Sequence, residues 1–134
     1  MTGRRFPDVQ AAVRALLLDL AEADSIKPAA WAGHLPFLHV YRYGGTDDGR
    51  TDVASVAVHV FAADYRDQPL TEDVRERMLA GPHVVQLADD RVVVLDNVTT
   101  LEAPVLVPYG PKVVRWVSSY RVTARRSSVP PPAP

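Results

Sequence analysis

The sequence Phe37-Leu38-His39-Val40-Tyr41-Arg42-Tyr43 is followed, after seven polar residues, by the longer run Thr51-Asp52-Val53-Ala54-Ser55-Val56-Ala57-Val58-His59-Val60-Phe61. β-Branched and aromatic residues dominate both runs, as they do in β-strands. The residues between the runs are rich in Gly and Asp, which tolerate the positive φ that a chain reversal needs. The two runs therefore predict a β-hairpin around which the rest of the chain is organised.

The second run alternates in a way that leaves neither face of the strand fully polar. Val56, Val58 and Val60 share one face, because successive side chains of a strand point to opposite sides. The other face carries Ser55, Ala57, His59 and Phe61. In a chain this small, a strand that is apolar on both faces predicts contact with a partner subunit.

The remaining elements are predicted from apolar periodicity and from helix start and stop signals. The spacing predicts helices over residues 7–23 and 69–80, and further strands over residues 91–101 and 113–125. The predicted order is α-β-β-α-β-β. The expected fold class is α+β, with two helices packed on a four-stranded, mostly antiparallel sheet. Residues 1–126 form one domain, and residues 127–134 form a disordered Pro-rich tail without core-forming side chains.

The composition excludes several classes of function. The 134 residues carry 15 Lys and Arg against 16 Asp and Glu, a net charge of -1, which argues against tight, sequence-independent DNA binding. The absence of cysteine excludes disulfides and thiolate metal sites. No apolar run approaches the roughly 18 residues that a membrane span needs, so no membrane partner is expected.

Two histidines are the best candidates for chemistry. His39 and His59 fall on neighbouring predicted strands, and two facing imidazoles could ligate a metal or act as acid and base. No third ligand is positioned by the sequence, so ordinary edge or interface histidines are favoured. Asp47, Asp48 and Asp52 lack the spacing of a calcium loop and its closing Glu. We therefore predict no catalytic residue, no metal site and no cofactor.

Several short strings resemble one protein family. They are Phe6-Pro7-Asp8-Val9 at the first helix, Leu35-Pro36-Phe37-Leu38-His39-Val40 at the hairpin, Val58-His59-Val60-Phe61-Ala62-Ala63-Asp64, and the closing Val114-Arg115-Trp116-Val117-Ser118-Ser119-Tyr120-Arg121-Val122-Thr123. In this pattern the chain resembles the tail terminator proteins of long-tailed, siphovirus-like bacteriophages. The resemblance spans residues 6–125. The sequence departs from simpler members of the family in its Pro-rich end and in the long loop over residues 104–111.

The resemblance implies a structural virion protein rather than an enzyme. Family members form a hexameric ring that caps the head-proximal end of the tail tube, ends tube polymerisation and presents a surface for joining the head. The implied partners are copies of the chain itself, the major tail tube protein and a head-completion or connector protein. DNA passes through such a ring without sequence-specific contacts. The implied location is the neck of the virion, reached from the host cytoplasm during assembly.

The polar tip of the hairpin is the predicted interface of such a ring. It consists of Gly44, Gly45, Thr46, Asp47, Asp48, Gly49 and Arg50. A long polar tip on two rigid strands forms a projecting arm that could reach a neighbouring subunit or the tube. Three alternatives stay open: another neck component, a tail tube subunit, and a small metal-binding enzyme that uses His39 and His59.

Overall fold

The computed structural model describes residues 4–24, 33–125 and 127–128 of the chain. Within them lie the helices α1 (Val9–Leu17) and α2 (Gln68–Leu79), with the short 3-10 helix η2 (Tyr65–Asp67) before α2. The strands are β1 (Arg4–Arg5), β2 (Glu22–Asp24), β3 (Phe37–Asp47), β4 (Thr51–Ala62), β5 (His83–Gln86), β6 (Val92–Leu106), β7 (Val114–Arg125) and β8 (Ser127–Ser128). None of the described helices is long and apolar enough to cross a membrane.

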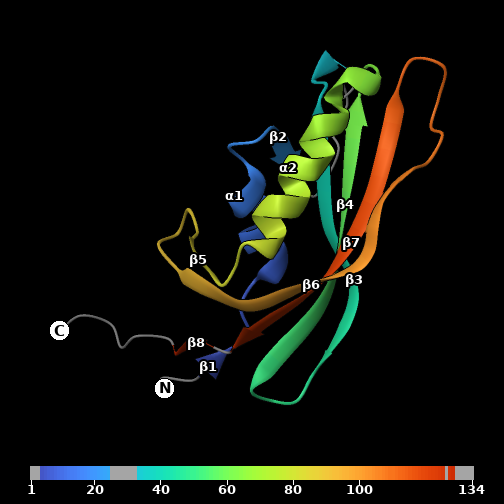
Figure 1. Ribbon diagram of the computed structural model, residues 1–134. Coiled ribbons are helices and arrows are strands. Elements are labelled where there is room, and N and C mark those ends of the chain that lie inside the picture. Colours follow the sequence, from blue (N-terminus) through green and yellow to red (C-terminus); the bar gives the residue numbers. More distant parts are fainter. Residues whose placement is uncertain (1–3, 25–32, 126, 129–134) are drawn as a thin grey trace.

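Six of the strands form one mixed, curled sheet in the order β2-β3-β4-β7-β6-β5. Only β2 runs parallel to its neighbour, and the other pairs are antiparallel. Figure 1 shows the sheet bending around α1 and α2, which lie on its inner side. A separate pair joins the two ends of the described chain, since β1 is antiparallel to β8. The chain is therefore mostly β, a half-barrel with two helices.

This architecture corrects the predicted four-stranded sheet. The hairpin and the two later strands exist, but β2 and β5 extend the sheet at its two ends. β2 is the three residues Glu-Ala-Asp, a composition that is depleted in strands, so it carries no sequence signal. It lies where the sequence predicted the last turns of the first helix, which instead ends at Leu17. β5 is four residues long, too short for a periodicity to identify it.

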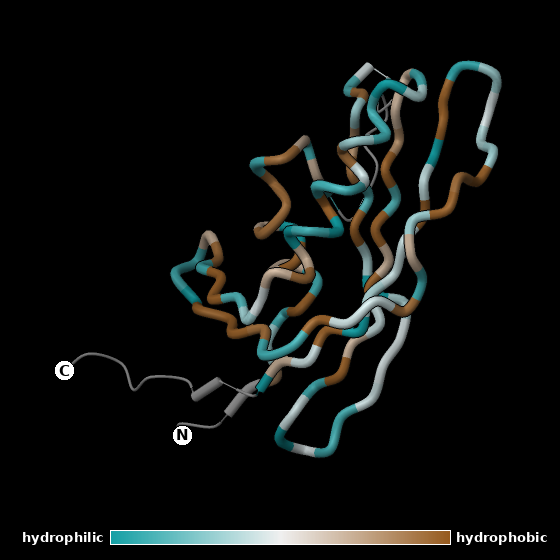
Figure 2. The backbone as a smooth tube through the Cα atoms, in the orientation of Figure 1, coloured by the Kyte–Doolittle hydropathy of each residue, from teal (hydrophilic) through white to brown (hydrophobic). Residues whose placement is uncertain are grey.

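The core lies between the helices and the inner face of the sheet. Helix α1 contributes Val9, Val13 and Leu17, which share one face and are almost completely buried. Alternate residues of β4, including the predicted Val56, Val58 and Val60, meet them from the sheet. Figure 2 shows the hydrophobic segments of α1, β5 and the first part of β6 lining this interior, whereas the far end of the β3–β4 hairpin is largely hydrophilic.

Two register shifts bend β6 where it leaves the core. They lie between Thr100 and Glu102 and between Glu102 and Val105, and each places extra residues of β6 opposite β7. A bulge increases the local twist and bends the strand that carries it. The outer part of β6 and β7 consequently stands away from the helices and ends in the loop over residues 107–113 (Figure 1). Pro104 lies in this outer part, where β6 pairs only with β7.

Candidate functional site

The predicted interface residues lie at the end of the β3–β4 hairpin, and all seven are exposed. The structure divides them differently from the expected loop. Gly44, Gly45, Thr46 and Asp47 continue β3 and pair with residues 52–55 of β4, so only residues 48–50 form the turn. We call residues 44–55 the arm. Figure 1 shows it projecting at the bottom of the molecule, beyond the helices.

The turn of the arm is closed by two carboxylates. Asp47 Oδ1 accepts a hydrogen bond from the Gly49 N–H at 3.0 Å. Asp48 Oδ1 accepts from the backbone N–H groups of Thr51 at 2.7 Å and Arg50 at 2.9 Å. These backbone hydrogen bonds lower the pKa of Asp48 below its ordinary value, because they favour the charged carboxylate. The tip is thus an ordered turn rather than a loose loop.

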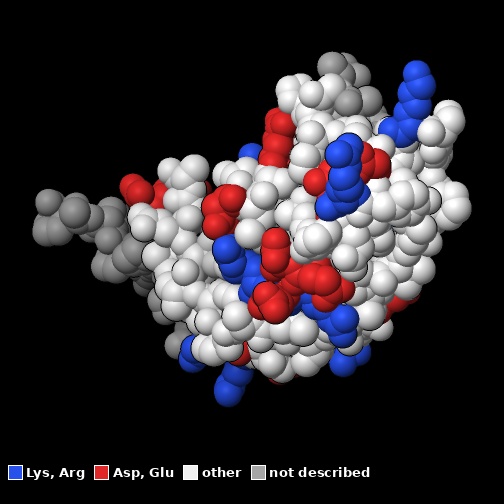
Figure 3. Space-filling model, turned by 45° about the horizontal axis from the view of Figure 1, so that its top comes forward, with Lys and Arg blue, Asp and Glu red and all other residues white. Residues whose placement is uncertain are grey.

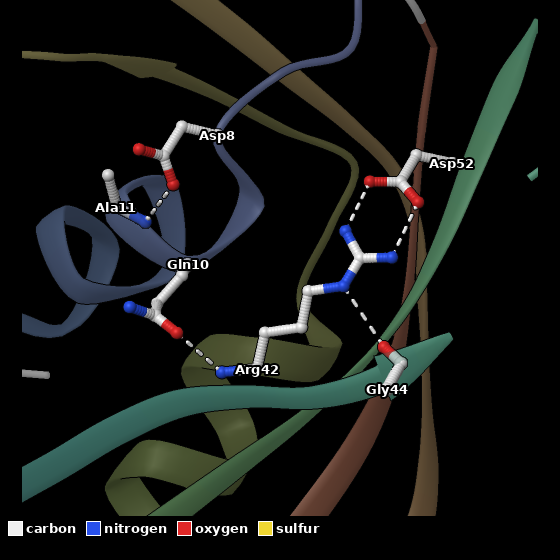
Figure 4. A network of polar contacts seen from close by, with 6 residues as sticks. All are labelled: Asp8, Gln10, Ala11, Arg42, Gly44 and Asp52. Carbon is white, nitrogen blue, oxygen red and sulfur yellow. Dashed lines mark hydrogen bonds and ion pairs between the residues drawn. The ribbon is translucent and has the colours of Figure 1, made fainter. Parts of the chain in front are cut away.

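A bidentate ion pair fixes the root of the arm. The guanidinium of Arg42 donates to Asp52 through Nη1 at 2.5 Å and Nη2 at 2.8 Å, and its Nε donates to the Gly44 carbonyl at 3.0 Å (Figure 4). The Asp52 side chain is only 6% exposed, against 33% for Arg42. The hydrogen bonds to Asp52 raise the pKa of Arg42 above its ordinary value. Two parallel N–H···O bonds hold a guanidinium in one orientation, so the pair connects β3 to β4 rigidly.

Helix α1 attaches to the same point. Its N-terminus is capped by Asp8, whose carboxylate accepts from the Ala11 N–H at 3.0 Å. The cap fixes the position of the first turn of α1, and Gln10 in this turn lies at the edge of β3. The Gln10 side-chain oxygen accepts from the Arg42 N–H at 2.7 Å, as Figure 4 shows. The helix thus covers the edge of β3 at Arg42, where the arm begins.

The arm leaves the sheet through a bulge that depends on glycine. The register of β3 against β4 shifts between Arg42 and Gly44. Gly45 has φ 131°, and a Cβ on it would lie 2.2 Å from the Val53 carbonyl oxygen and 2.9 Å from Arg42 Nη2. Only glycine fits this conformation and this spacing. Gly44, by contrast, would accept a Cβ with no atom within 4 Å.

Arg42, Asp52 and Gln10 were not predicted as functional residues. The sequence held one usable signal, because a hairpin with a seven-residue loop over residues 44–50 places Arg42 directly opposite Asp52. In the structure Arg42 pairs with Val56 instead, and its long side chain reaches Asp52 past the bulge. Nothing in the sequence pointed to Gln10, since its contact joins residues 32 positions apart.

The two candidate histidines do face each other. His39 pairs directly with His59 across β3 and β4, and their rings lie edge to face with centroids 5.8 Å apart. The Tyr41 hydroxyl and His59 Nε2 form a hydrogen bond of 3.1 Å. Among the described residues no group of three or more His, Cys, Asp or Glu could hold a metal ion. His34 and His83 lie elsewhere, the first beside Glu22 and the second against the Met78 carbonyl.

The sheet face that carries these histidines is partly covered by the chain itself. Phe61 is 1% exposed although α1 and α2 pack on the other face, and the Tyr109 ring packs edge-on against it with centroids 5.1 Å apart. The guanidinium of Arg115 lies over the same tyrosine ring, 5.1 Å from its centroid. Apolar residues on the outer face of β4 are thus explained in part by the loop over residues 107–113, without a partner subunit.

Charged side chains of both signs are interspersed over much of the surface. Figure 3 shows one face on which acidic groups gather at the centre and basic groups lie around them. Many of these charges form ion pairs, such as Asp19 with Arg77 at 2.6 Å, Asp64 with Arg66 at 2.7 Å and Asp96 with Arg125 at 2.9 Å. No concentrated basic field appears on that face, and the expected absence of tight, sequence-independent DNA binding stays a prediction.

The comparisons with known proteins add no relative. A scan against protein-family models finds none that matches this chain, and a search of curated proteins finds no matching sequence.

Proposed function

We propose that this protein caps the head-proximal end of the tail tube of a long-tailed phage, where it ends tube polymerisation and provides the surface for head joining. Its partners in this role are further copies of itself in a hexameric ring, the major tail tube protein and a head-completion protein. It assembles in the host cytoplasm and stays in the neck of the virion. The proposal needs no cofactor and no catalytic residue.

The observation that carries the proposal is the preformed arm. Its strands are paired, its turn is closed by Asp47 and Asp48, and its root is held by Arg42 and Asp52. A surface that is already ordered loses little conformational entropy on binding, so more of its contact energy appears as affinity. A projecting hairpin whose residues 44–50 are all exposed is well suited to contact a neighbouring subunit or the tube.

A second group of residues supports a role in assembly. Leu101, Val105, Leu106 and Tyr109 are 40–46% exposed and lie close in sequence at the outer end of β6 and in the loop that follows. Val105 and Leu106 are consecutive strand residues and point to opposite faces, so this end offers exposed apolar side chains on both sides to another protein. A ring on a tube would bury both this end and the arm.

The test is binding to tail tubes of the same phage. Replacing residues 48–51, which connect the paired Asp47 and Asp52, with an Asn-Gly turn shortens the tip and keeps the register of the hairpin. We expect this variant to fold but to co-sediment poorly with tubes. A matched control replaces residues 88–90, the exposed tip between β5 and β6, with the same two residues. Normal tube binding by the arm variant would show that the arm is dispensable.

Two outcomes favour the alternatives. A tube subunit would polymerise without limit when purified, whereas a terminator should stop at a ring. A small enzyme that uses His39 and His59 would bind a transition metal in stoichiometric amount, which elemental analysis of the purified protein would detect. Either result would replace the proposal.

A further inference from the structure

Three stretches of strand edge longer than three residues have no strand partner among the described residues. β2 pairs with only the first three residues of β3, so β3 is open beyond His39. β5 is the last strand of the sheet and is open on its outer side. β6 is open beyond Leu95, where its pairing with β5 ends. An open edge presents unpaired N–H and C=O groups that can pair with a strand of another chain.

The open stretch of β6 is poorly suited to such pairing. Pro104 has no N–H to donate, and the register shifts at Thr100 and Glu102 interrupt the regular spacing of the backbone groups. Proline and bulges are features by which proteins protect edges from one another. This edge is therefore blunted.

The edge of β3 in the arm has the opposite character. From Gly44 to Asp47 the register is regular, and the segment contains neither proline nor lysine. Gln10 occupies the edge at Arg42, so helix α1 covers the root and not the arm itself. Gly44 leaves room for another backbone to approach closely, since a Cβ there would meet no atom within 4 Å.

β5 matches the arm in length and exposure. Its four residues are His83, Val84, Val85 and Gln86, and none of them is an aspartate, glutamate, lysine or proline. Val84 is 73% exposed, more than any other large hydrophobic residue described. Val85 is buried in the core, so Val84 points away from the helices. Thr46 points the same way, because it pairs with Val53 while Ala54 faces the core.

We infer that the arm edge of β3 in one copy pairs with β5 of a second copy, so that the sheets of neighbouring subunits join end to end. β5 ends the sheet order on one side and β3 lies next to the last strand on the other, with β5 at the left of Figure 1 and the arm at the bottom. The contact is therefore heterologous, and repeated contacts of this kind close into a ring or extend as a filament. Thr46 and Val84 would share one face of the joined sheet, as β-branched neighbours on paired strands do. The inference rests on the proposed ring and names its subunit contact.

Disulfide cross-linking tests the contact directly, because the chain has no cysteine of its own. The double variant Thr46→Cys/Val84→Cys should give a ladder of covalent oligomers under oxidising conditions, and Thr46→Cys/Gln86→Cys covers a shift of two residues in register. Each single variant should stay uncross-linked, and a mixture of Thr46→Cys and Val84→Cys chains should give dimers only. The control Thr46→Cys/Val92→Cys places an exposed cysteine on β6, off the edge, and should give no ladder.

A blocking variant provides the second readout. Val84→Lys puts a charge on the edge without disturbing the core, and should weaken self-association measured by sedimentation velocity by at least about tenfold at an unchanged melting temperature. Val92 is 47% exposed, so Val92→Lys is the matched control, and this variant should associate normally. Association of Val84→Lys equal to wild type would overturn the inference.

The outcomes separate this inference from the proposed function. If the wild-type protein caps tubes but the double-cysteine variants form no ladder, either free in solution or bound to tubes, the edge contact is overturned. The capping role is then unaffected. A ladder from protein that neither binds tubes nor limits their length would support the contact and overturn the capping role. Cross-links from Thr46→Cys to the tube protein, instead of to Val84→Cys chains, would mean that the arm edge binds the tube and not a second copy.

Discussion

At the scale of single residues, the ion pair at the root of the arm is asymmetric. The Asp52 carboxylate is almost fully buried, whereas one third of the Arg42 side chain is exposed. Removing one partner of a buried ion pair leaves the other charge without compensation. Loss of Arg42 therefore leaves the more costly charge behind, since water reaches Arg42 but not Asp52.

We expect Arg42→Met to lower the free energy of unfolding by roughly 3 kcal/mol, near the lower end for breaking a buried pair. Asp52→Asn should cost less, because the amide remains a hydrogen-bond acceptor and Arg42 remains partly hydrated. Urea unfolding of both variants measures the difference. Equal costs for the two substitutions would contradict the asymmetric burial.

The Tyr120 hydroxyl is the second informative residue. Tyr120 is fully buried, and its hydroxyl has no hydrogen-bond partner among the described residues. The nearby Ser118 hydroxyl donates to the Val58 carbonyl at 3.3 Å. Burial raises the pKa of Tyr120 above its ordinary value of 10.0. The folded state therefore keeps this proton at a pH where the unfolded state loses it, and stability falls as the pH rises above about 10.

We expect Tyr120→Phe to be neutral or to stabilise the protein by up to about 1 kcal/mol, because it removes a buried hydroxyl that makes no hydrogen bond. Thermal unfolding at neutral pH measures this effect, and unfolding above pH 10 should be less steep with pH in the variant than in the wild type. A loss of more than about 1 kcal/mol would mean that the hydroxyl has a bonding partner after all.

At the scale of elements, the arm depends on the conformation of one glycine and not on its neighbour. We expect Gly45→Ala to destabilise the arm by roughly 1–3 kcal/mol, because the new methyl group meets the Val53 carbonyl at a positive φ. Gly44→Ala is the matched control and should change little, since a Cβ there meets no atom. Hydrogen exchange of the arm amides, compared with core amides, locates the effect. Similar exchange rates in both variants would contradict the bulge geometry.

The turn of the arm should respond to acid. The folded pKa of Asp48 lies below its ordinary value of 3.8, so its carboxylate stabilises the turn above that pH. The stabilisation is lost as the pH falls below 3.8 through the lower folded value. We expect the amides of Arg50 and Thr51 to lose protection over this range, as measured by NMR. In the variant Asp48→Ala, these two amides should already be less protected at neutral pH. Their protection should not decrease further as the pH falls below 3.8.

The elements also show which parts of the fold a sequence can predict. The hairpin and α2 were predicted nearly in place, because β-branched alternation and a Gly-Pro stop are local signals. β2 could not be predicted, since its Glu-Ala-Asp sequence becomes a strand only by pairing with the start of β3. The arm was predicted as the site but as a loose loop, because the contacts that order it come from Arg42, Asp52 and Gln10 on three separate elements.

At the scale of the whole molecule, the arm, the open edge of β5 and the exposed apolar end of β6 lie on different sides of one curled sheet. A monomer with several such surfaces is suited to contact more than one partner at once. The proposed ring uses the first two between subunits and leaves the third for the tube or the head-side protein. The helices lie inside the curl and hold the sheet in shape.

The most direct test of the capping role is the length of tail tubes assembled in the presence of this protein. Tube protein of the same phage is polymerised with increasing amounts of the wild-type chain, and tube lengths and ends are measured by negative-stain electron microscopy. We predict shorter tubes at higher ratios, each with a ring at one end only, and uncontrolled lengths with the arm-shortened variant. Tubes of unchanged length without a terminal ring, at any ratio of wild-type protein, would contradict the account.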